Sequence, residues 1–236
     1  MNKKKILGLA GGAIVAVILL IVGWYWYEGA HYVTTDDSRI AANLVPISPE
    51  IPGKVIEWDV QEGDRVNAGD VLGRQDLGTL LNTGTINTST LATIGSIAAE
   101  KASIKSPIAG QVIKSSAVVG EMASPGMVLA VVADTDSLYV QANIEETHIG
   151  HVKLGQHVDI DVDAYPGVTF PGVVETIGRA TSSTFSLLPA QNSGGNYTKV
   201  TQIVPIKIHL IDTRNKSLLV GMNTSIRIYL DSTPQR

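Results

Sequence analysis

The chain has 236 residues, carries a formal net charge of -4 and contains no cysteine. The lack of cysteine excludes a disulfide scaffold, a thiolate nucleophile and cysteine-based zinc sites. Mild acidity and scattered lysines and arginines argue against a nucleic-acid-binding protein, which usually shows a clustered basic surface.

The N-terminus has the pattern of a single membrane-spanning helix. Lysines at positions 3–5 precede an uncharged stretch over residues 6–27. At ~1.5 Å per residue, a helix of this length spans ~33 Å, which is enough for the hydrocarbon core. The expected membrane anchor at its end, suited to the headgroup region, is formed by Trp24, Tyr25, Trp26 and Tyr27.

The lysines favour the cytoplasmic side, so residues 1–5 are predicted to be a cytoplasmic tail. The chain is then a single-pass protein of the cytoplasmic membrane, with its N-terminus inside and its bulk outside the cytoplasm. The alternative is a cleaved signal peptide, but the apolar run is long for one and the bulky aromatic end is a poor cleavage site.

Beyond residue 28 the sequence predicts a mainly β fold. Apolar and polar side chains alternate over residues 156–163, which is the period of a half-buried strand. Residues 203–211 and 225–230 show the same alternation, and Pro205 is expected at an edge or a bulge.

Two other segments are expected to differ from these strands. Residues 142–153 are predicted to contain a short helix that ends near Gly155. Residues 181–198 are rich in Ser, Asn, Gln and Gly, and are expected to form a long loop.

An internal repeat with an offset of 57 residues is the most informative feature of the sequence. The repeated positions pair Gly53 with Gly110, Gly63 with Gly120, Gly69 with Gly126, Val55 with Val112, Val71 with Val128 and Leu72 with Leu129. Glycine permits positive φ at the turns, and the Val and Leu positions supply a core face. One copy of ~25 residues is too small to bury a core alone. The two copies therefore predict one interlocked β-sandwich.

Taken in order, these motifs resemble the HlyD-type membrane fusion proteins, also called periplasmic adaptor proteins. Residues 48–55 and 106–112 are similar to the paired half-motifs of a biotinyl/lipoyl-like domain. Residues 138–146 resemble the start of the family's β-barrel domain, and residues 155–158 and 163–166 resemble its strands.

Other stretches are closer to the EmrA branch of that family, which serves major-facilitator multidrug pumps. They are residues 32–38, 185–192 and 195–200. The resemblance implies an N-terminal transmembrane helix, a split lipoyl-like sandwich with a short hairpin insert, and a β-barrel domain. The expected segments are 1–5 cytoplasmic tail, 6–27 transmembrane helix, 28–45 connecting strand, 46–76 first half-motif, 77–102 short hairpin insert, 103–134 second half-motif, and 135–236 β-barrel domain and C-terminal tail.

The resemblance implies a membrane-anchored adaptor that supports export of drugs or other small compounds. Its expected partner is a polytopic inner-membrane transporter of major-facilitator type, and homo-oligomers are expected. The insert over residues 77–102 is much shorter than the long helical hairpin of the family. Two helices of ~11 residues reach only ~16 Å, which makes an outer-membrane channel a doubtful partner. The alternatives are an envelope or cell-surface binding module without a transporter and a degenerate biotin-carrier subunit.

No residue is assigned a catalytic role, and no cofactor is expected. Lys101 and Lys105 flank the second half-motif, but neither occupies a tight turn between the halves as an acceptor lysine would. A metal site at His148, His151 and His157 was weighed against solvated surface histidines, which are favoured.

Small-molecule binding is the remaining chemistry that the sequence suggests. A β-barrel beside a lipoyl-like sandwich leaves an interdomain cleft, which is a common location for ligands. The aromatic candidates for ligand contact are Tyr165, Phe170 and Phe185, although ordinary packing is the competing role for each.

Overall fold

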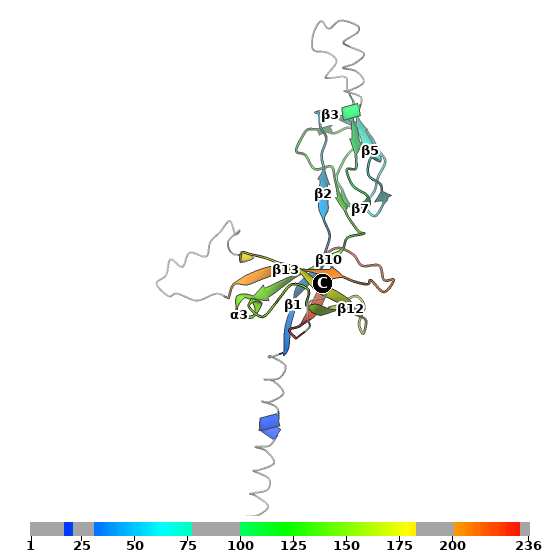
Figure 1. Cartoon of the computed structure of the whole chain (residues 1–236). Helices are drawn as coiled ribbons and strands as arrows, with labels where there is room; N and C mark the ends of the chain where they lie inside the picture. The colour runs from blue at the N-terminus through cyan, green and yellow to red at the C-terminus, as the bar shows by residue number, and fades with distance from the viewer. Residues whose placement is uncertain (1–16, 21–30, 77–99, 183–200, 232–236) are drawn as a thin grey trace, which may run out of the picture. The chain divides into compact units, whose positions relative to one another are not determined.

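The computed structural model describes residues 17–20, 31–76, 100–182 and 201–231. Residues 42–138 form one compact unit, and the chain on either side of them forms a second (Figure 1). Within the described ranges, residues 17–20 are helical, and no helix has the length and apolarity needed to cross a membrane. The predicted span over residues 6–27, including its aromatic anchor, lies mostly outside the described residues and stays a prediction.

The unit formed by residues 42–138 is a sandwich of two four-stranded antiparallel sheets. Their strand orders are β2-β9-β7-β4 and β6-β5-β3-β8, so each sheet contains strands from both copies of the repeat. The strands are β2 (Leu44–Ile47), β3 (Gly53–Trp58), β4 (Arg65–Val66), β5 (Val71–Gln75), β6 (Ser103–Lys105), β7 (Gly110–Ser115), β8 (Met122–Ala123) and β9 (Ala130–Ala133).

The two halves interlock through an exchange of turns. The Gly63 N–H donates to the Val112 carbonyl at 2.8 Å, and its repeat equivalent, the Gly120 N–H, donates to the Val55 carbonyl at 2.7 Å. Both glycines have a φ of +97°, a backbone conformation that residues other than glycine rarely adopt. Each half therefore completes the sheet of the other, as the repeat predicted.

The sandwich core is formed by the Val and Leu positions of the repeat together with their neighbours. Val55, Leu72, Val112 and Leu129 are each at most 1% exposed. The complete cluster of buried residues consists of Ile47, Val55, Val66, Leu72, Ile104, Val112, Ala123, Leu129, Ala130 and Val132. Burial of this apolar surface by both halves together is what stabilises a unit that neither half could form alone.

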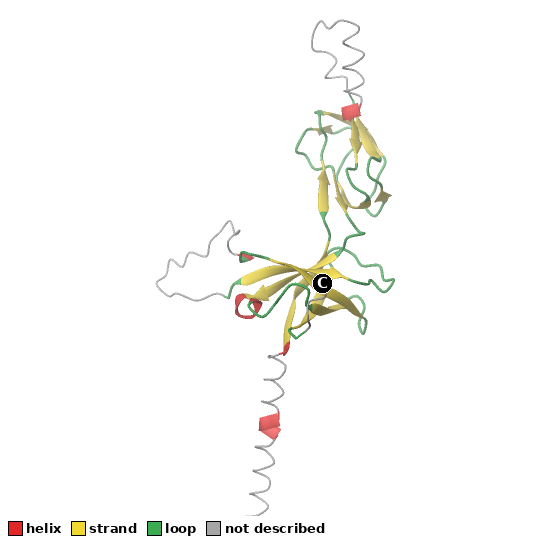
Figure 2. Cartoon of the chain, in the orientation of Figure 1, coloured by secondary structure: helices red, strands yellow, loops and turns green. Residues whose placement is uncertain are grey.

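The second unit is a closed six-stranded antiparallel barrel in the order β1-β10-β13-β12-β11-β14. Figure 2 shows that strands make up most of its described regular structure. The elements are β1 (Tyr32–Ala41), β10 (Tyr139–Glu145), α3 (Glu146–Ile149), β11 (His157–Val162), β12 (Thr169–Ile177), β13 (Ile203–Leu210) and β14 (Asn223–Tyr229). The strands expected over residues 156–163, 203–211 and 225–230 are confirmed as β11, β13 and β14.

Pro205 lies inside β13 of this closed barrel, and the register shift between β12 and β13 lies opposite Lys207 and Ile208, so the expectation of an edge strand or a bulge at Pro205 is wrong. Its carbonyl accepts the N–H of Gly178, which follows the last residue of β12. In an antiparallel strand the nitrogen and carbonyl of one residue point to the same side. The proline nitrogen, which cannot donate, therefore faces the point where β12 has ended.

The stretch expected as one connecting strand over residues 28–45 is corrected by the sheet pairings. Its β1 part is a full barrel strand that pairs with β10 on one side and β14 on the other. The sandwich begins separately with β2, which pairs with β9. The barrel therefore takes its first strand from before the sandwich and the other five from after it.

The short helix expected within residues 142–153 is present as α3, but it covers only Glu146–Ile149 and ends before the expected position, because β10 continues to Glu145. Val140, Ala142 and Ile144 are buried in the barrel, whereas the residues between them are partly exposed. This alternation has the period of a strand. The long loop expected over residues 181–198 lies mostly outside the described residues.

Candidate functional site

The insert leaves and re-enters the sandwich through two neighbouring strands. Arg74 of β5 pairs with Ser103 of β6 in an antiparallel ladder. The chain between them covers residues 77–102, of which residues 100–102 are described and helical. The two ends of the insert lie one strand spacing apart. The insert can therefore vary in length without changing the strand pairing of the sandwich.

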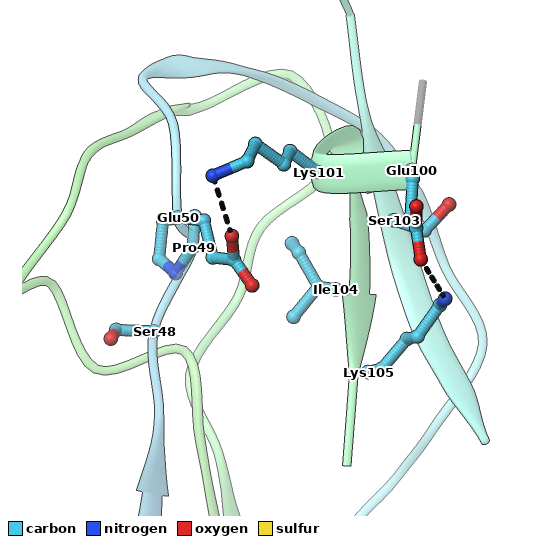
Figure 3. Close-up of a pocket in the computed structure, with 8 residues that line it drawn as sticks. All are labelled: Ser48, Pro49, Glu50, Glu100, Lys101, Ser103, Ile104 and Lys105. Carbon is cyan, nitrogen blue, oxygen red and sulfur yellow. Dashed lines mark ion pairs between the residues drawn. The ribbon is translucent and has the colours of Figure 1, made fainter. Parts of the chain in front are cut away.

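A pocket of about 390 Å³ lies at the base of this insert (Figure 3). The Lys101 Nζ is 3.3 Å from a Glu50 carboxylate oxygen, and the Lys105 Nζ is 3.8 Å from that of Glu100. Ile104 is buried and contributes an apolar wall. The complete lining consists of Ser48, Pro49, Glu50, Glu100, Lys101, Ser103, Ile104 and Lys105.

The Lys101–Glu50 pair connects the end of the insert with the segment before β3, whereas the Lys105–Glu100 pair joins β6 to the end of the insert, and both lie on the surface. Exposed pairs of this kind contribute about 0–1 kcal/mol each, so they orient the base of the insert more than they stabilise it. Both lysines considered as cofactor-attachment positions have a carboxylate beside them. The pocket lining therefore carries two lysines and two carboxylates in balance.

The histidines considered for metal binding are placed separately. His148 lies on α3 with its Nδ1 3.8 Å from the Glu145 carboxylate, and His157 lies on β11 with its Nε2 3.5 Å from Asp159. His151 is exposed in the turn after α3. Over the described ranges, no cluster of three or more His, Asp or Glu side chains could hold a metal ion.

Asp159 also accepts a hydrogen bond of 2.6 Å from the Tyr229 hydroxyl, across the β11–β14 pair. This hydrogen bond, followed by burial, raises the pKa of Tyr229 above its usual value. The Tyr229 ring lies 5.1 Å from that of Tyr32, edge to face, and 5.7 Å from that of His157. Sequence reasoning missed this cluster, because its members come from three strands far apart in the chain.

The aromatic residues proposed as ligand contacts have different environments. Phe170 is fully buried in the barrel, with its ring 6.3 Å from that of Tyr165. Tyr165 is partly exposed, and its hydroxyl donates to the Ser217 carbonyl at 2.7 Å. Phe185 lies outside the described residues. Packing accounts for the position of Phe170, and a ligand role for any of the three stays a prediction.

Comparison with known proteins agrees with this architecture. Residues 43–135, which cover almost the whole sandwich unit, match the family described as "RND MFP, barrel-sandwich hybrid domain". The chain is similar to the "Putative efflux system component YhbJ" of Bacillus subtilis, with 36% identity over 231 residues that cover 97% of this chain and 94% of YhbJ. It is also similar to the "Multidrug export protein EmrA" of Escherichia coli, with 36% identity over 135 residues. That match covers 56% of this chain and 35% of EmrA.

Among solved structures, the fold is similar to that of MacA from Actinobacillus actinomycetemcomitans. The TM-score is 0.61 at 18% identity, and the match covers 84% of this chain and 81% of MacA. The match of the sandwich to this family model and the similarity to YhbJ over almost the whole of both chains identify the class as membrane fusion proteins. The chain belongs to the HlyD/EmrA-type membrane fusion proteins, which confirms the resemblance found in the sequence.

Proposed function

We propose that the chain is a membrane-anchored adaptor that supports export of drugs or other small compounds by a partner transporter. The observation that carries this proposal is the similarity to YhbJ over almost the whole of both chains, since YhbJ is named as a component of an efflux system. EmrA, similar over the shorter stretch, is named as a multidrug export protein. We infer a polytopic inner-membrane transporter of major-facilitator type as the partner, with homo-oligomers of the adaptor around it.

The arrangement of the chain supports an adaptor that works close to its own membrane. The predicted span over residues 6–27 precedes the first barrel strand by four residues, and the insert over residues 77–102 lies between β5 and β6 in the chain. Two helices of ~11 residues would reach only ~16 Å beyond the sandwich. Contact with an outer-membrane channel is therefore not part of the proposed function.

Crosslinking in native membranes tests the proposal. The full-length chain, tagged at its C-terminus, is crosslinked in its own cells, and the captured proteins are identified by mass spectrometry. The expected product contains a polytopic transporter, and its yield falls when the insert is replaced by a Gly/Ser segment of equal length. Repeated capture of no transporter would contradict the adaptor function and favour an envelope binding module.

A susceptibility assay and a mass measurement separate the remaining alternatives. Deletion of the gene is expected to increase sensitivity to some members of a broad compound panel, and unchanged sensitivity to all of them argues against drug export. The intact mass of the purified chain is expected to match its sequence. An added biotinyl or lipoyl mass would instead support the carrier-subunit alternative.

A further inference from the structure

One rim of the barrel is held close to the predicted membrane anchor by the length of the chain. Residues 28–31 separate Tyr27, the last aromatic residue of the anchor, from Tyr32, where β1 begins. Even a fully extended chain of this length spans only about 17 Å. Whatever lines the rim at the start of β1 therefore lies within reach of the lipid headgroups.

The antiparallel barrel order identifies the other elements at this rim. Tyr229, at the end of β14, pairs with Tyr32, and the adjacent β11 begins there with His157. The end of β12 follows, because β12 runs antiparallel to β11 and continues beyond Val173, the partner of His157, toward this rim. The turn before β11, residues 153–156, therefore lies on the same rim as Tyr32.

This turn is fixed in place by a buried glutamine. Gln156 is 1% exposed, and its side-chain N–H groups donate to the carbonyls of Leu230, at 3.1 Å, and His151, at 3.3 Å. Its side-chain oxygen accepts the Lys153 N–H at 2.8 Å. Leu154 stands on this fixed turn with 55% of its surface exposed. An ordered turn thus presents a bulky apolar side chain to the surroundings.

The surface around Leu154 is amphipathic and of mixed charge. A shallow hollow of about 390 Å³ is formed by Leu154, Glu175, Thr176, Ile177, Gly178 and Arg179. Tyr32 and Tyr229, both partly exposed, add rings that bear a hydroxyl. Tyrosine and leucine side chains of this kind suit the boundary between headgroups and acyl chains. Glu175 and Arg179 both line the hollow, so charge alone does not explain a contact.

We propose that this rim, with Leu154 at its tip, rests in the headgroup layer of the membrane in which the chain is anchored. The contact depends on apolar and aromatic side chains, so it requires no anionic lipid. It orients the barrel relative to the membrane, where a flexible tether alone would leave the barrel free to tumble. The inference rests on the proposed membrane anchor and adds a lipid-contacting surface to it.

Site-specific fluorescence tests this contact with the full-length chain in phosphatidylcholine vesicles. The chain has no cysteine, so Leu154→Cys places one environment-sensitive label on the rim. Leu219→Cys is the matched control, because Leu219 is 54% exposed and precedes β14 at the opposite rim. Spin-labelled lipids are expected to quench the label at position 154 several-fold more strongly than the label at position 219.

The outcomes separate the rim contact from the anchor. Vesicle flotation with equal quenching at both positions would contradict the lipid contact and leave the anchor intact. Failure of the chain to float with the vesicles would contradict the anchor and the contact together. Quenching at position 154 that appears only with anionic lipid would show that the rim binds charge and would overturn the proposal. Protection of the label at position 154 that appears only in native membranes with their proteins would show that the rim binds a protein partner, and would overturn it too.

Discussion

Gly53 and Gly110 occupy equivalent positions of the repeat, at the first residues of β3 and β7. A Cβ atom at Gly53 would lie 2.9 Å from the Asp76 carbonyl oxygen, and one at Gly110 would meet the carbonyl oxygen of Ala133. Asp76 and Ala133 are themselves equivalent in the repeat. The same close approach of two backbones therefore occurs in each half, and it requires glycine at both positions.

Replacement of Gly110 by alanine is expected to destabilise the sandwich by about 1–3 kcal/mol, because the backbone carbonyl in the way is held in the β7–β9 ladder. Hydrogen exchange of the β7 and β9 amides measures this change. Gly150→Ala is the control, because Gly150 has a φ of -61° and no atom within 4 Å of the added Cβ. The change in protection is measured for each variant against the unchanged chain, in the unit that carries the substitution. Equal changes in the two variants would contradict the close-approach argument.

Contacts between residues far apart in the chain could not be predicted from the sequence unless a repeat related them. The repeat predicted the glycines because their spacing recurs. It predicted Val55 and Val112 as core residues because the apolar positions recur at the same offset. The Tyr229–Asp159 hydrogen bond and the Lys101–Glu50 ion pair follow no local period. Each depends on which strands or segments become neighbours, which no local pattern of residues determines.

Among the elements, β5 and β6 give the insert its support. Their pairing brings Arg74 and Ser103 opposite each other, so the chain leaves and re-enters the sandwich at neighbouring positions. The repeat predicted this arrangement, since residues 77–102 interrupt two copies that otherwise follow one pattern. The short helix predicted within residues 142–153 is shorter than expected. Its first residues belong to β10, where alternation through Val140, Ala142 and Ile144 has the period of a strand.

Replacement of residues 78–99 by a short glycine-containing turn is expected to leave the sandwich folded. Loop closure changes by only about 0.6 kcal/mol for each doubling of loop length, so protection of β5 and β6 amides from hydrogen exchange should change little. Capture of the transporter is expected to fall in the same variant. A Gly/Ser segment of natural length is the control for spacing. Loss of protection throughout the sandwich would show that the insert is part of its fold.

At the scale of the whole chain, the units are nested insertions. The sandwich is inserted between β1 and β10, which pair with each other at Ala41 and Tyr139. Residues 77–102 are inserted in turn between β5 and β6, which also pair. Each insertion leaves and returns through neighbouring antiparallel strands, so the outer unit can close around it. This nesting allows the insert to change in length while the barrel and the sandwich keep their pairings.

Charged residues placed within the predicted membrane span are expected to prevent its insertion into the membrane. Ile18→Arg combined with Leu20→Arg introduces two charges near the centre of the predicted span, each costing about 2.5–3.5 kcal/mol on insertion. The full-length variant is expected to leave the carbonate-resistant membrane fraction, as measured by immunoblotting. The control is Val118→Arg with Val119→Arg, which adds the same charges at sandwich positions that are 59% and 58% exposed. Because these valines lie outside the predicted span, the control should stay in the membrane. Retention of the Ile18/Leu20 variant in that fraction would show that residues 6–27 are not what holds the adaptor there.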